Sequence, residues 1–121
     1  MAILNYTTQI NANRTVGEIQ QILAKGKVKQ ISIDYNENGE PSAVQFMILC
    51  NDQNVYFRLP CNVEGVYKAL CRSKVPYRLQ TMEQARRVAW RIIKDWIEAQ
   101  LAIVEAGQSM LEELFLPYAV I

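Results

Sequence analysis

Basic side chains that can bind phosphate are concentrated in one stretch of the chain. From Lys68 to Lys94 there are eight basic residues and one acidic residue, whereas Asp95 to Glu113 holds five acidic residues and no basic residue. The whole chain carries a formal charge of only +1, so its overall composition hides this asymmetry. Guanidinium groups bind phosphate through paired hydrogen bonds, and aromatic rings stack on bases. The basic stretch, with Tyr77 and Trp90 interleaved, therefore suits a phosphate-bearing ligand.

Arg58 joins this group from a predicted strand. Strict alternation over Val55–Leu59 places Arg58 on the face opposite to Phe57, so that it either reaches a ligand over the sheet or pairs with Asp34 on the neighbouring strand. The candidate ligand-binding residues are thus Arg58, Tyr77, Arg78, Arg86, Arg87, Trp90, Arg91 and Lys94. The alternative is a solvated basic face that complements the acidic end of a neighbouring copy.

The residues that common catalytic mechanisms need are missing from the sequence. The chain has 0 histidines, which excludes Ser-His-Asp and Cys-His catalysis and every zinc site that contains histidine. It also has no glycine-rich phosphate-binding motif, and its carboxylates are scattered rather than clustered. We therefore expect a protein that is not an enzyme and that has no catalytic residue, metal or cofactor. An enzyme that uses a Lys, a Cys or paired acids is the alternative.

The cysteines and the hydropathy pattern bear on the compartment. Cys50, Cys61 and Cys71 are separated by 11 and 10 residues, which fits neither a CxxC clip nor a disulfide framework. We expect buried free thiols, with a reactive thiol as the alternative. Met1–Ile10 lacks the basic start and apolar run of a secretory signal, and no apolar run is long enough to span a membrane. The expected location is the cytoplasm.

The N-terminal half must supply the sheet. A chain of 121 residues, half of them apolar, predicts a single α+β domain over residues 1–121. Capping residues at Thr15–Glu18 and the stop at Gly26 predict a short helix. The predicted strands are Val28–Tyr35, Ala43–Cys50 and Val55–Leu59, with an Asn-Gly hairpin turn between the first two. With an extended Ile3–Ile10, they form a small antiparallel β-meander of three to four strands.

The C-terminal half is predicted to be helical and dominated by one long helix. Asn62 caps a second helix that ends before Pro76. A capping box beginning at Thr81 opens the long helix, which runs from Met82 to Ala106 without glycine or proline. A last short helix, capped by Ser109, leads to an apolar tail.

Apolar residues cover more of the long helix than one contact with a sheet requires. A first stripe includes Ala85, Val88 and Ile92, and a second stripe lies beside it. The residues of the second stripe are Trp90, Ile93, Ile97, Leu101 and Val104. We expect this stripe to form a homo-oligomeric interface, since exposed apolar patches of that extent are rare in monomers. The alternative is that the other helices of the same chain cover it.

Four segments together resemble a family of small proteins encoded by phages and prophages. They are Ile3–Thr8, Phe57–Pro60, Val88–Leu101 and Phe115–Tyr118. The resemblance spans nearly the whole chain, and the run Trp-Arg-Ile-Ile-Lys-Asp-Trp at Trp90–Trp96 is its most specific part. It implies a phage context and the cytoplasm of a bacterial host, and it brings no catalytic positions. By analogy, small phage accessory proteins are often antagonists of host defence.

Three functional hypotheses follow, of which we favour the first and keep the other two as alternatives. The first is a counter-defence protein that sequesters a nucleotide second messenger, like anti-Thoeris and anti-CBASS sponges, in a basic and aromatic pocket between subunits. The second is a module that binds nucleic acid or a host defence complex, as anti-CRISPR proteins do. The third is a structural or replication accessory protein. A sponge needs an enclosed pocket that joins Arg58 to Arg86–Lys94, whereas a nucleic-acid binder needs an open basic track whose affinity falls with salt.

Overall fold

The computed structural model describes residues 2–26, 28–50, 52–106 and 115–120, and its architecture is α+β, as predicted. The helices are α1 (Ala12–Ala24), α2 (Val63–Arg72) and α3 (Met82–Glu105), with short 3-10 helices η1 (Tyr77–Leu79) and η2 (Leu116–Tyr118). The strands are β1 (Val28–Tyr35), β2 (Pro41–Cys50), β3 (Gln53–Pro60) and β4 (Ala119–Val120), and they form one antiparallel sheet in the order β1-β2-β3-β4. No helix within these residues is long and apolar enough to cross a membrane.

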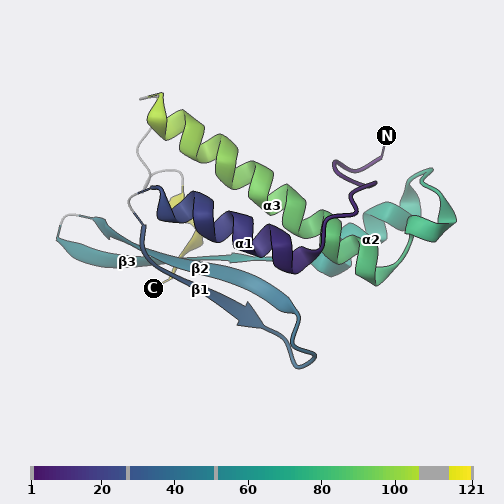
Figure 1. The fold of residues 1–121 in the computed structure, drawn as a ribbon, viewed down its shortest axis with the longest axis horizontal. Coiled ribbons are helices and arrows are strands. Elements are labelled where there is room, and N and C mark those ends of the chain that lie inside the picture. The colour runs from purple at the N-terminus through teal and green to yellow at the C-terminus, as the bar shows by residue number, and fades with distance from the viewer. Residues whose placement is uncertain (1, 27, 51, 107–114, 121) are drawn as a thin grey trace.

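The helices among the described residues cover one face of the sheet. Figure 1 shows α1 and α3 side by side over the same face, while α2 lies beyond the end of the sheet. The strand register places Ile31, Phe46 and Phe57 in one row across the sheet, and this row points toward the helices. Phe46 and Phe57 are stacked with their ring centroids 5.4 Å apart, and Phe115 packs edge-on against both. The main core is therefore a layer between the sheet and the α1–α3 pair.

The β1–β2 hairpin forms where the Asn-Gly pair predicts it. Gly39 has a φ of 75°, which favours glycine because it has no Cβ. The side chain of Asn36 accepts hydrogen bonds from the backbone N–H groups of Asn38 (2.9 Å) and Glu40 (3.0 Å). The turn is thus stabilised by residues within five positions of each other, which is why the sequence alone could locate it.

Two predictions for the N-terminal segment are wrong, one about a strand and one about the start of a helix. The predicted strand at Ile3–Ile10 is instead a turn, in which Tyr6 N–H donates to the carbonyl of Ile3, and the fourth strand comes from the C-terminal end. The first helix begins at Ala12 rather than at Thr15, because Asn11 caps it by accepting from the N–H of Asn13 at 2.8 Å. Thr15 lies fully buried inside this helix. The predicted helix capped by Ser109 lies outside the described residues.

The second apolar stripe of α3 is covered largely by the chain itself. Trp90 and Ile97 have 0% of their surface exposed, and Ile93 and Leu101 pack against the same core cluster. The side chain of Val104 lies outside the described part. The expectation that a second copy must cover this stripe is therefore wrong for Trp90 and Ile97, because the sheet and α1 already do so. Homo-oligomerisation itself stays a prediction, but the apolar stripe of α3 no longer supports it.

Ile97→Glu tests this packing. We expect it to lower the free energy of unfolding by about 3–5 kcal/mol, because it buries a charge without a partner. Ala99→Glu is the matched control, since Ala99 is exposed on the same helix, and it should change stability by less than about 0.5 kcal/mol. Urea denaturation followed by circular dichroism measures both. An Ile97→Glu protein of unchanged stability that forms a smaller species in solution would instead place Ile97 between copies.

Candidate functional site: an exposed basic lobe

Most of the predicted phosphate-binding residues are already paired with carboxylates. Five of the six basic candidates form ion pairs: Arg58 with Asp34, Arg86 with Glu40, Arg87 with Glu83, Arg91 with Glu18, and Lys94 with Glu98. In three of these pairs the carboxylate comes from a different element, namely α1, β1 or the β1–β2 turn. These basic residues therefore join parts of the fold, and their charge is largely neutralised within the chain.

The predicted pocket between Arg58 and the arginines of α3 does not form within one copy. Arg58 lies on the uncovered face of the sheet, since its neighbours Phe57 and Leu59 point into the core. Its Nε lies 3.1 Å from Oδ2 of Asp34, which also accepts from the side chain of Gln45. Helix α3 packs on the opposite face. Arg58 and the Arg86–Lys94 segment are therefore separated by the sheet.

Trp90 has no surface with which to stack on a ligand. Its ring is fully buried, and its indole N–H donates to the carbonyl of Pro41 at 3.2 Å. A buried Trp normally finds such a partner, and here the partner lies at the start of β2. We therefore assign Trp90 to the core and remove it from the candidate site.

Arg86 and Arg87 line a hollow of balanced charge. The hollow has a volume of about 360 Å³ and lies between the start of α1, the β1–β2 turn and the start of α3. Glu40 and Glu83, the partners of the two arginines, line the same hollow. Because each guanidinium already faces a carboxylate, the hollow offers an incoming anion no excess of positive charge.

Within the basic stretch Lys68–Lys94, the basic residues without an ion pair among the described residues lie before α3. We call Val63–Gln80 the basic lobe; it contains α2, η1 and the turn between them. Its four basic residues, Lys68, Arg72, Lys74 and Arg78, are all exposed, and none forms an ion pair among the described residues. Its acidic residue is Glu64. Tyr77 and Arg78 thus remain candidates, whereas Lys68, Arg72 and Lys74 belong to the basic stretch but were not singled out by the sequence.

The fold of α2 explains why these side chains point outward. Asn62 caps the helix as predicted, accepting from the N–H of Gly65 at 2.9 Å. Leu70 is fully buried, and Val63, Val66 and Tyr67 pack in the same small cluster. Lys68 and Arg72 lie four residues apart, so they share the exposed side of the helix. An open groove of about 720 Å³ lies at the C-terminal end of this helix and is lined by Arg72 and Lys74 together with Ala2 and Ile3.

The pairing of Arg91 predicts a role in stability. Its Nη1 lies 2.8 Å from Glu18 on α1, and only 15% of the Arg91 side chain is exposed. Arg91→Ala should lower the free energy of unfolding by about 1–3 kcal/mol, because Glu18 loses a half-buried partner. Arg14→Ala, at an exposed position of α1, is the control. Denaturation of Arg91→Ala, Glu18→Gln and the double variant forms a cycle, and simply additive losses would argue against the coupling.

The expectation of buried free thiols is wrong for Cys71, which is exposed, whereas Cys61 is partly buried, and this difference predicts their reactivity. Burial raises the pKa of the Cys61 thiol from 9.0 to about 12, an effect that Arg86 only partly opposes, whereas Cys71 is exposed. Because the thiolate is the reactive form, iodoacetamide at about pH 8 should label Cys71 quickly and Cys61 much more slowly until the protein is unfolded. Peptide mapping by mass spectrometry measures both. The side chain of Cys50 lies outside the described part.

The raised pKa of Cys61 also fixes the sign of a pH effect on stability. Between pH 9.0 and about 12 the unfolded chain loses this proton while the folded chain retains it. The contribution of Cys61 to stability is therefore complete below pH 9.0 and is lost as the pH rises toward 12. Rapid labelling of Cys61 in the native protein would contradict its burial.

Comparison with known proteins assigns the chain to no family. No protein-family model matches the chain, and neither a curated protein nor a solved structure matches it significantly.

Proposed function

We propose that the protein is a non-enzymatic binding protein that holds the phosphate backbone of a nucleic acid against the basic lobe. The observation that supports this most directly is the sorting of its basic residues. The basic residues of α3 form ion pairs with carboxylates. In the basic lobe, by contrast, four exposed basic residues form no ion pair among the described residues: Lys68, Arg72, Lys74 and Arg78. Unpaired cations on one surface are what phosphate-backbone binding requires.

The shape of the lobe favours a chain-like ligand over a small enclosed one. The groove at the C-terminal end of α2 is open to solvent, and two basic side chains, Arg72 and Lys74, line it. A sponge for a nucleotide messenger was expected to join Arg58 to the α3 arginines, and in one copy these lie on opposite faces of the sheet. An open track that follows a backbone is the form that nucleic-acid binders use. The second of the three hypotheses is therefore the one we favour.

The biological setting that fits this proposal is counter-defence. The resemblance to small phage proteins suggests that the bound nucleic acid belongs to a host defence complex or to the phage itself. In either case binding needs no catalytic residue, which agrees with the absence of histidine from the chain.

Salt dependence tests the proposal. A fluorescein-labelled oligothymidylate of about 15 nucleotides should bind in fluorescence anisotropy. The logarithm of its affinity should fall with the logarithm of salt concentration, with a slope of roughly −3 if four phosphates are contacted. Lys74→Gln should weaken binding and make the slope shallower by about 0.7.

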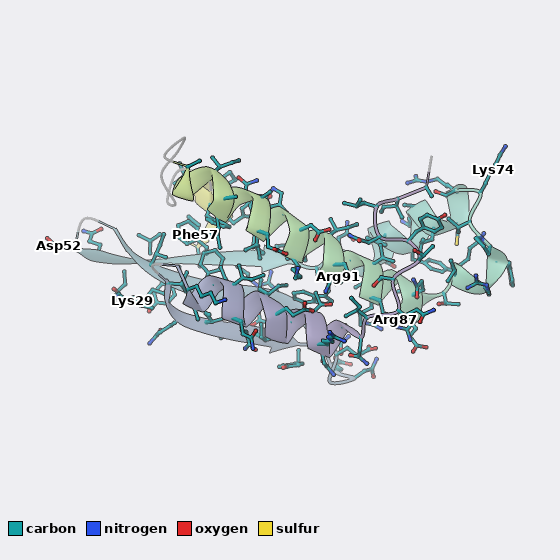
Figure 2. All side chains as sticks on the ribbon, turned by 45° about the horizontal axis from the view of Figure 1, so that its top comes forward. Lys29, Asp52, Phe57, Lys74, Arg87 and Arg91 are labelled. Carbon is teal, nitrogen blue, oxygen red and sulfur yellow. The ribbon has the colours of Figure 1, made fainter. Side chains whose placement is uncertain are left out.

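Lys29→Gln is the matched control. Both lysines are exposed, and Figure 2 shows them at opposite ends of the molecule. Equal effects of the two substitutions, or no binding by the wild type, would overturn the proposal. Cyclic dinucleotides and cyclic ADP-ribose isomers are tested by calorimetry in parallel. Tight binding of one of them that Lys74→Gln leaves unchanged would favour the sponge.

A further inference from the structure

Tyr77 is unusually exposed for an aromatic residue in a folded chain. With 87% of its surface accessible, it is the most exposed large hydrophobic side chain among the described residues. Aromatic rings contribute most to stability when they are buried, so this ring contributes little to the folded core. Arg78 follows it directly, and Lys74 lies three residues before it. The ring therefore stands among the cations that the proposed function assigns to phosphates.

The backbone that carries Tyr77 is held in place on both sides. The N–H of Leu79 donates to the carbonyl of Pro76 at 2.9 Å, and the N–H of Gln80 donates to the carbonyl of Tyr77 at 3.0 Å. The side chain of Gln80 also donates to the carbonyl of Val75 at 3.2 Å. Val75 is buried in the small core of the lobe, and Leu79 packs against the same cluster. The ring is thus presented from a fixed turn, and binding need not order the backbone first.

Tyr77 follows the end of α2 after a short turn. Helix α2 ends at Arg72, and Tyr77 begins η1 five residues later. Arg72 and Lys74 line the open groove at this end of α2. Tyr77 therefore lies close in the chain to the two basic residues of the groove.

Resting on the proposed function, we infer that the basic lobe selects single-stranded nucleic acid by stacking one base on Tyr77. Bases in a duplex are stacked on each other, so only an unpaired base offers its face to a protein ring. Every base has such a face, and stacking therefore tolerates different sequences. The cations hold the backbone, and Tyr77 distinguishes a strand with accessible bases from a duplex.

Three labelled probes of about 15 units separate stacking from charge. They are oligothymidylate, an abasic strand with the same phosphates, and a duplex. Tyr77→Ala should weaken oligothymidylate binding roughly 5- to 150-fold, the range for one stacked base. It should leave the salt slope and the affinity for the abasic strand unchanged. Tyr77→Phe should restore binding, because it keeps the ring. Tyr56→Ala, which removes another exposed ring on the uncovered face of the sheet, should have no effect.

The outcomes distinguish this inference from the proposed function. If the wild type binds all three probes equally, or if Tyr77→Ala leaves oligothymidylate binding unchanged, stacking on Tyr77 is overturned while backbone binding by the lobe stands. If no probe binds, the proposed function fails, and this inference fails with it. Loss of oligothymidylate binding in Tyr77→Ala, with retained binding of the abasic strand, supports both.

Discussion

The packing of α3 across one face of the sheet is the contact on which the rest of the structure depends. Trp90, near the middle of this 24-residue helix, is fully buried, and its N–H bonds to Pro41 at the start of β2. A four-stranded sheet with one uncovered face needs an apolar layer on the other, and α3 with α1 supplies it. Because α3 extends past the sheet, its first turns also support the basic lobe.

Charge pairing follows from this arrangement and decides which cations remain available. Docking α1 on α3 brings Glu18 to Arg91, and the β1–β2 turn brings Glu40 to Arg86. Removing half-buried arginines from water is costly unless such partners are present. Acidic residues of the N-terminal half thus neutralise Arg86 and Arg91, two residues of the basic stretch that lie on α3. The lobe packs beside α3 rather than on the sheet, so its cations meet no such carboxylates among the described residues.

The N-terminal turn ties the two cores together. Asn5, in a left-handed conformation with a φ of 67°, donates from its side chain to Asp95 at 2.8 Å. Gln84 is buried, and its side chain donates to the carbonyls of Tyr6 and Thr8 while it accepts from Arg87. A buried amide with all these partners fixes the segment firmly on α3. The turn thereby supplies one wall of the open groove at the C-terminal end of α2.

The sequence by itself determined the features whose causes are local. The Asn-Gly turn, the cap at Asn62, the strands β1, β2 and β3 and the extent of α3 all depend on residues a few positions apart. Only the tertiary structure decided which basic residues are free, because Glu18 lies 73 positions from its partner Arg91. It likewise decided that Ile97 is covered by its own chain. Burial and ion pairing are set by contacts across the fold, and periodicity along one helix cannot identify the element that covers each face.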